Sequence, residues 1–233
     1  SNKEITFLKK YKPWGVILFS RNIKNIKQIK KLIDEIKKIF NDPNYPILID
    51  QEGGRINRLS KIIDTSIFSA RFFGKLYETN KKKFFTYFKI YIDYTSYFLN
   101  EMGININTVP VLDVSRKKTH NIIGDRSYSK YPNIVSKIGD YCIDEFKKKR
   151  IANIIKHIPG HGLSLTDSHK KTPIVKKNKK YLLKNDFFKF TNKKTFFAMT
   201  AHIIYKDIDP KNTATHSKKV INLIRKNIGF KNL

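Results

Sequence analysis

Five short apolar runs, separated by longer amphipathic segments, are the feature that most constrains how this chain folds. The runs are continuous rather than alternating, which is typical of strands buried on both faces of a sheet. They cover Trp14–Phe19, Pro46–Asp50, Ile104–Asp113, Ile151–His157 and Phe196–His202. In the intervening segments apolar residues recur every three or four positions, as helices require. This repetition of strand and helix predicts a parallel α/β fold.

The amphipathic segments predict five helices. They lie over 26–40, 84–98, 134–146, 182–188 and from 218 onward. Asn22 is the expected N-cap of the first helix, and Gly103 is expected to end the second. Pro132 suits the first turn of the third, and Ser217 suits the cap of the last.

Polar residues lie at the carboxyl ends of the predicted strands, where the chain leaves the sheet. These residues are Ser20–Asn22, Asp50–Glu52, Asp113, His157 and His202. A β/α barrel and an open doubly wound sheet both place ligands at this edge, so the pattern leaves both architectures open. No glycine-rich dinucleotide or P-loop signature follows any strand, which argues against those two ligand classes.

The strongly basic composition raises the question of a polyanionic partner. The 233 residues carry 48 Lys plus Arg against 19 Asp plus Glu, a net charge of +29, but only eight of the basic residues are Arg. Dedicated phosphate and base readers favour the bidentate Arg fork. Abundant Lys, Asn and Ile together are typical of an AT-rich genome. We therefore expect solvated lysines and no specific nucleic-acid partner, with a functional polyanion site as the alternative.

Further composition limits the class of protein. Cys142 is the single cysteine, which excludes an intrachain disulfide framework. Hydrophobic residues make up 40% and aromatic residues 13%, too many for a disordered chain. No apolar run approaches the roughly 20 residues of a membrane span, and the first residues show no signal-peptide pattern. The expectation is a cytoplasmic protein with no membrane partner.

The densest cluster of reactive side chains lies within 156–169. Lys156 and His157 lead into a tight turn formed by Pro159, Gly160 and Gly162, and Asp167 and His169 follow. A carboxylate beside an imidazole fixes its tautomer and makes it a proton shuttle. A zinc site is the rival interpretation, with ligands from His157, His161, His169 and Asp167. The spacing matches no zinc signature, so we expect neither a metal nor another cofactor.

Two further clusters combine carboxylates with arginine. The first is Asp50–Arg55 with Arg58, where an ionised carboxylate suits sugar hydroxyls. Arg58 either pairs with Asp50 or holds a polar ligand. The second is Gly124–Tyr128, where Arg126 is either a ligand-binding residue or an ordinary loop arginine.

Taken together and in this order, these segments resemble glycoside hydrolase family 3, and within it the NagZ-type β-N-acetylglucosaminidases. The motifs that carry the resemblance are GVILFSRN (15–22), IDQEGGRINR (49–58), PVLDV (110–114), IGDRSY (123–128), KHIPGHG (156–162), DSH (167–169), TP (172–173) and MTAHIIYKDIDP (199–210). The resemblance implies one catalytic domain over 1–233, a TIM-type (β/α)8 barrel. It is expected to be truncated at both ends, with the first and last strands missing.

The resemblance also implies an activity and roles for residues. The substrate would be terminal, non-reducing β-linked N-acetylglucosamine of cell-wall (peptidoglycan) fragments, cleaved by a retaining monomeric enzyme. His169 would be the general acid/base, assisted by Asp167. The sugar would be bound by Asp50, Arg58, Arg126, Lys156 and His157. The nucleophilic Asp of the family would lie beyond Leu233, so this chain alone is expected to be inactive. A family 3 β-glucosidase and a Lys-rich binding protein without catalysis are the alternatives.

Overall fold

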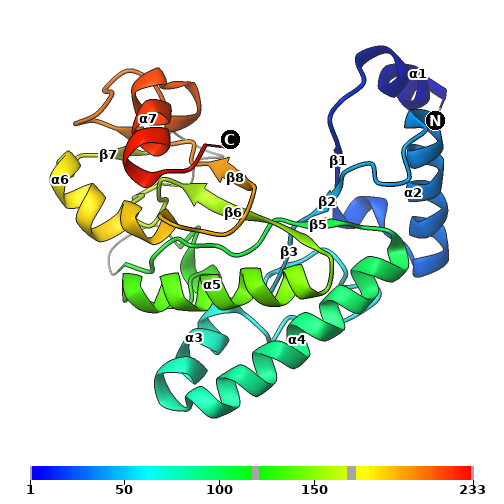
Figure 1. Ribbon diagram of the computed structural model, residues 1–233, viewed down its shortest axis with the longest axis horizontal. Coiled ribbons are helices and arrows are strands. Elements are labelled where there is room, and N and C mark those ends of the chain that lie inside the picture. The colour runs from blue at the N-terminus through cyan, green and yellow to red at the C-terminus, as the bar shows by residue number, and fades with distance from the viewer. Residues whose placement is uncertain (1, 117–120, 167–171, 232–233) are drawn as a thin grey trace.

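One curved sheet of five parallel strands forms the centre of the protein, with helices against its outer side (Figure 1). The computed structural model describes residues 2–116, 121–166 and 172–231. The strand order is β1-β2-β5-β6-β8. These strands are β1 (Val16–Leu18), β2 (Ile47–Ile49), β5 (Ile106–Asn107), β6 (Ala152–Ile158) and β8 (Phe197–Thr200). All five predicted strands are therefore confirmed, four within their apolar runs, while β6 extends one residue past its run to Ile158.

The helices follow the strands in the alternation that the sequence predicts. They are α1 (Asn2–Tyr11), α2 (Ile26–Phe40), α3 (Ala70–Thr79), α4 (Lys81–Met102), α5 (Pro132–Lys148), α6 (Lys179–Leu182) and α7 (Lys218–Leu223). Two small sheets pair β3 (Gln51–Gly53) with β4 (Ile56–Asn57), and β7 (Ile174–Val175) with β9 (Ile204–Tyr205). Segments Leu183–Phe187 and Ile224–Ile228 continue α6 and α7 as π-helical turns. None of the described helices is long and apolar enough to span a membrane.

The start of α2 differs from the prediction. Asn25, not Asn22, is its N-cap, and the Asn25 side chain accepts a hydrogen bond from the Gln28 amide at 2.8 Å. The Asn22 side chain instead accepts from the Phe19 amide at 3.0 Å and closes a 3-10 turn. The turn places Ser20–Asn22 directly after β1, so the N-cap lies three residues later than expected, while the helix itself spans the predicted 26–40.

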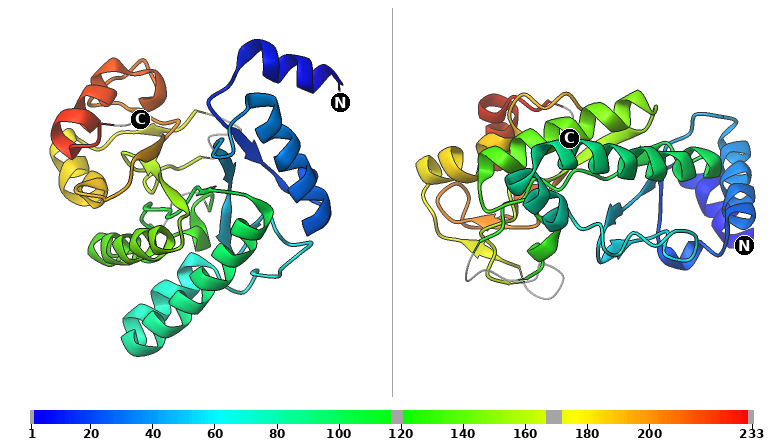
Figure 2. Two further views of the ribbon diagram at one scale, coloured as in Figure 1. Left: turned by 45° about the vertical axis from the view of Figure 1, so that its right-hand side comes forward. Right: turned by 90° about the horizontal axis from the view of Figure 1, so that it is seen from below.

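The sheet is part of a barrel rather than a doubly wound sheet. Seen from a second direction, the strands form an arc with the helices outside it, and the arc is open between the two chain ends (Figure 2). Within the described residues β1 and β8 are the outer strands of the five-stranded sheet, so the barrel is incomplete.

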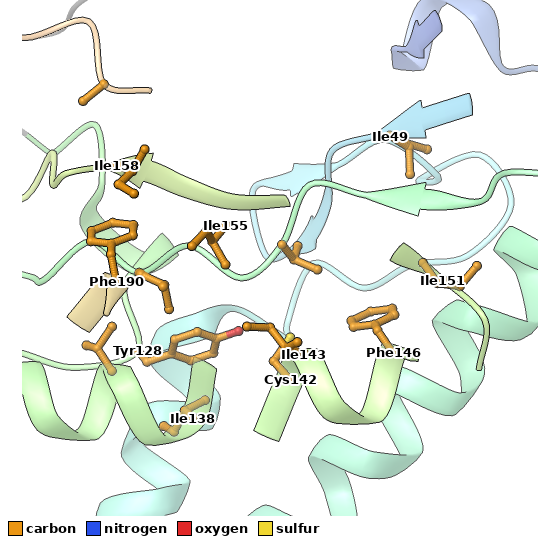
Figure 3. Close-up of a cluster of buried hydrophobic side chains, with 14 of the residues drawn as sticks. Ile49, Tyr128, Ile138, Cys142, Ile143, Phe146, Ile151, Ile155, Ile158 and Phe190 are labelled. Carbon is orange, nitrogen blue, oxygen red and sulfur yellow. The ribbon is translucent and has the colours of Figure 1, made fainter. Parts of the chain in front are cut away.

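The packing of β6 against α5 decides which side chains face the inside of the arc. Ile151 and Ile155 lie toward α5, beside Cys142 and Phe146 (Figure 3). Successive side chains of a strand point to opposite faces. Lys156 therefore points to the concave side, where it is 1% exposed.

Candidate active site

Charged side chains from separate strands converge on Lys156 at the concave side of the sheet. The Lys156 ammonium lies 2.8 Å from Asp50 Oδ1, which follows β2, and 2.6 Å from Glu52 Oε1 of β3. It also donates to the Thr108 hydroxyl, after β5, at 2.9 Å. Thr108 in turn donates to Asp50. A buried ammonium needs such partners. This cation therefore holds two carboxylates at the carboxyl ends of the strands, which form the rim of the incomplete barrel.

Two arginines extend this cluster. Arg126 donates to both oxygens of Glu52, with Nε and NH2 each 2.8 Å away, in the bidentate geometry that suits a carboxylate. Arg58 approaches Asp50 Oδ2 from the other side, with its NH2 at 3.5 Å. That distance is too long for a strong hydrogen bond, and the Asp50 side chain is 15% exposed. Asp50 Oδ2 is thus the carboxylate oxygen of this cluster that is best placed to accept from a ligand hydroxyl.

The cations hold Asp50 and Glu52 ionised. Burial alone would raise the pKa of both carboxyl groups, and the Lys156 ammonium is the largest of the influences that oppose it. With further help from Arg58 at Asp50 and from Arg126 at Glu52, the pKa of each is lowered to about 2. Both side chains are therefore hydrogen-bond acceptors, not proton donors, near neutral pH.

The second group at the rim is an aspartate and histidine pair. His157 Nδ1 lies 2.6 Å from Asp113 Oδ2, and the His161 amide donates to Asp113 Oδ1 at 2.6 Å. Burial would raise the pKa of Asp113, but His157, His161 and Lys189 hold it well below its usual range. The ionised Asp113 accepts a hydrogen bond from the Nδ1–H of His157, which leaves His157 Nε2 for a ligand. Burial lowers the pKa of His161, which keeps that ring neutral.

Close backbone contacts hold the segments that carry these side chains. A Cβ on Gly74 of α3 would lie 1.5 Å from the Tyr128 carbonyl oxygen, so α3 packs directly against the segment after Arg126. A Cβ on Gly162 would lie 2.3 Å from the Val114 carbonyl oxygen. Only glycine permits both approaches, and they bring the Arg126 segment and the turn after His157 to the rim.

The predicted site residues fall into two groups. Asp167 and His169, the expected acid/base pair, lie outside the described residues. Asp50, Arg58, Arg126, Lys156 and His157 all lie at the rim. Asp50, Arg58 and Lys156 are in direct contact, Arg126 joins them through Glu52, and His157 contacts Asp113 instead. Their roles toward a sugar stay predictions.

Sequence reasoning did not assign three residues that organise the rim. Glu52 holds both Lys156 and Arg126, Thr108 links Asp50 to Lys156, and Asp113 orients His157. Glu52 lies inside the DQEGGR motif and Asp113 ends a predicted strand, so both positions carried a signal. Thr108 lies in the middle of an apolar run and carried none.

A zinc site is the rival interpretation of the histidine cluster within 156–169. Over residues 2–116, 121–166 and 172–231, no group of three His, Cys, Asp or Glu side chains is arranged to hold a metal ion. Because Asp167 and His169 lie outside these ranges, the absence of a metal stays a prediction.

The lowered pKa values give the cluster a defined pH dependence. The unfolded chain protonates Asp50 and Glu52 near their ordinary pKa values of 3.8 and 4.5, whereas the folded chain keeps both ionised to about pH 2. Their contribution to stability is fully present above about pH 5 and is lost as the pH falls toward 2. We expect the free energy of unfolding in urea to fall over this range. The slope should be smaller in Glu52→Gln, and an equal slope in both proteins would contradict the assignment.

Comparison with known proteins identifies the family. The whole chain, residues 1–233, matches the glycosyl hydrolase family 3 N-terminal domain. It is 30% identical over 210 residues to beta-hexosaminidase A of Pseudoalteromonas piscicida, and 29% identical over 221 residues to the beta-hexosaminidase of Nitrosomonas eutropha. NagZ from Neisseria gonorrhoeae, solved in complex with N-trifluoroacetyl-D-glucosamine, matches 100% of the chain with a TM-score of 0.89 and 26% identity. The protein therefore belongs to glycoside hydrolase family 3.

The match covers most of this chain but only part of each relative. It includes 87% and 93% of this chain for the two hexosaminidases, and 35% and 62% of their own lengths. The chain covers 69% of the NagZ structure. The incomplete barrel and the resemblance to the NagZ-type branch are thereby confirmed.

Proposed function

We propose that this chain supplies the sugar-binding part of a β-N-acetylhexosaminidase that removes terminal, non-reducing β-linked N-acetylglucosamine from peptidoglycan fragments. The observation that carries the proposal is the ionised Asp50, held by Lys156 and flanked by Arg58 at the strand ends. An ionised carboxylate with one oxygen turned to the rim accepts strong hydrogen bonds from sugar hydroxyls. The names of the relatives and the glucosamine derivative bound by the gonococcal NagZ support N-acetylglucosamine as the sugar.

The proposed reaction is retaining and uses a histidine where most glycosidases use a second carboxyl group. His169, assisted by Asp167, protonates the leaving oxygen while an aspartate attacks the anomeric carbon. The same histidine then deprotonates the water that releases the sugar. Asp50, Glu52 and Asp113 are all engaged by cations or by hydrogen-bond donors, which suits binding and support rather than attack. We therefore propose that none of them is the nucleophile and that the 233-residue chain alone is inactive.

Turnover of nitrophenyl glycosides tests this proposal. The chain alone should release no nitrophenol from the β-N-acetylglucosaminide. A chimera that continues with the part of the gonococcal NagZ beyond the matched region should release it, and should favour this substrate over the β-glucoside. In the chimera, His169→Ala should lower the rate by about 10²–10⁴-fold.

Each alternative outcome has a clear meaning. Robust turnover by the 233-residue chain would place the nucleophile within it. Preference of the chimera for the glucoside would favour a β-glucosidase, and an unchanged rate in His169→Ala would remove that residue from the acid/base role. His216→Ala, at an exposed position on the turn Ala214–His216, is the matched control and should leave the rate unchanged.

A further inference from the structure

Helix α4 has a second apolar face that the described part of the chain leaves exposed. Its inner face, which includes Phe84, Phe88 and Ile92, is buried, and the helix contacts α2, α3 and α5. The opposite face points outward, and α4 lies across the surface in the right-hand view, seen from below (Figure 2). Six exposed side chains form this outer face, which we call the α4 stripe: Lys83, Tyr87, Ile90, Tyr94, Tyr97 and Glu101.

The spacing of the α4 stripe is that of a coiled-coil seam. Its members are separated alternately by four and three residues, which is the a and d pattern of a heptad repeat. The four apolar members are exposed by 48% (Tyr87), 59% (Ile90), 51% (Tyr94) and 60% (Tyr97). Single exposed apolar residues are ordinary on a surface, but a continuous seam of them is typical of a contact surface. The α4 stripe therefore suits a second helix.

The order of residues in the α4 stripe is symmetric about position 92. Tyr87 and Tyr97 are equally far from it, and so are Ile90 and Tyr94. Across a two-fold axis each contact between one residue and a residue of the other copy occurs twice, so a seam with symmetric positions lets all its members meet a partner at once. We propose that two copies of this chain associate through antiparallel pairing of their α4 helices. Tyr87 then packs on Tyr97 of the other copy, and Ile90 on Tyr94.

The charges at the two ends of the α4 stripe favour this direction. Lys83 and Glu101 are also equally far from position 92, so antiparallel pairing puts each Lys83 opposite a Glu101 of the other copy. Parallel pairing would put lysine against lysine and glutamate against glutamate. Asp93 is held within its own chain by Lys89 and Lys149, at 2.5 and 2.9 Å, and leaves these end pairs undisturbed.

The size of the α4 stripe sets the strength of the association. Four half-exposed side chains with about 200 Å² each offer roughly 400 Å² per chain. Stable complexes bury about 800 Å² per partner, and two chains of charge +29 repel each other. The dimer is therefore weak, with a dissociation constant in the micromolar range, and salt strengthens it by screening the repulsion. This proposal replaces the expectation of a monomer.

Sedimentation equilibrium of the 233-residue chain at near-physiological and higher salt tests the proposal. The wild type should dimerise, and Ile90→Lys should abolish the dimer. Ile174→Lys makes the same change at a site of similar exposure (52%) on β7 and should leave it intact. Lys83→Glu should weaken the dimer about tenfold, and Lys83→Glu/Glu101→Lys should restore it to within about threefold. Lys30→Glu on α2 is the control for net charge. Circular dichroism confirms that each variant is folded.

Three results would overturn the proposal. One is a wild type that stays monomeric to several hundred micromolar at both salt concentrations. Another is a dimer that persists in Ile90→Lys, or one whose dissociation constant is unchanged in Lys83→Glu. The third is a monomer that binds phosphatidylserine vesicles through the same residues, with the binding lost in Ile90→Lys, because the α4 stripe would then face a membrane.

Discussion

Replacing Lys156 with methionine should lower the free energy of unfolding by about 3–5 kcal/mol. The side chain is buried, and its ammonium lies within 2.9 Å of Asp50, Glu52 and Thr108. Lys156→Met keeps an unbranched side chain, one atom shorter, and removes the charge, so two carboxylates remain at the rim without their shared cation. A buried ion pair adds little net stability over apolar packing, but removing one partner leaves the other charge uncompensated.

Urea unfolding at about pH 7 measures this loss, and its pH dependence identifies the cause. Without Lys156 the pKa values of Asp50 and Glu52 should rise, so mild acid should reduce the deficit of the variant relative to the wild type. Lys89→Met is the matched control, because that exposed lysine pairs with Asp93 at the surface and its loss should cost less than about 1 kcal/mol. A cost of the same small size for Lys156→Met would contradict the account of the cluster.

Replacing Asp50 with asparagine should weaken N-acetylglucosamine binding by at least about tenfold while the chain stays folded. A hydrogen bond to an ionised acceptor contributes about 1.5–3 kcal/mol, and asparagine offers a neutral oxygen and an added donor in its place. The donor would point toward Lys156 or Arg58, both of which are cations. Glu52 still holds Lys156 in this variant, so the fold keeps its main buried pair.

The sequence predicts the sheet well because each buried parallel strand appears as an apolar run, which can be recognised without knowing the neighbouring strand. Continuous apolar runs locate all five strands, and the polar residues after them locate the functional edge. The two unpredicted helices lack a comparable signal. Helix α1 has no buried residue, and the ten-residue α3 fully buries only Phe73 and Gly74, so each leaves a weaker signal than the longer helices. The predicted cap of α2 was wrong because Asn22 and Asn25 are both suitable N-cap residues. Only the 3-10 turn after β1 decides between them.

The contacts within the site were less predictable because they join distant parts of the chain. Asp50 and Lys156 are 106 positions apart, and Glu52 and Arg126 are 74 apart. Residue type and position indicate that such groups meet at the carboxyl ends of the strands, but they do not say which cation neutralises which carboxylate. Arg58 illustrates this limit, since pairing with Asp50 and binding a ligand were both open and the observed 3.5 Å approach allows both. The pairing of His157 with Asp113 likewise joins residues 44 positions apart, which local sequence does not determine.

The rim around Asp50 is proposed to bind N-acetylglucosamine. Titration of the isotopically labelled 233-residue chain with N-acetylglucosamine, followed by NMR, tests it without requiring turnover. Asp140→Asn changes an exposed carboxylate on α5 and is the matched control. The account predicts saturable binding by the wild type and Asp140→Asn, and binding at least about tenfold weaker in Asp50→Asn. Equal binding by all three folded proteins, or no binding by the wild type, would contradict it.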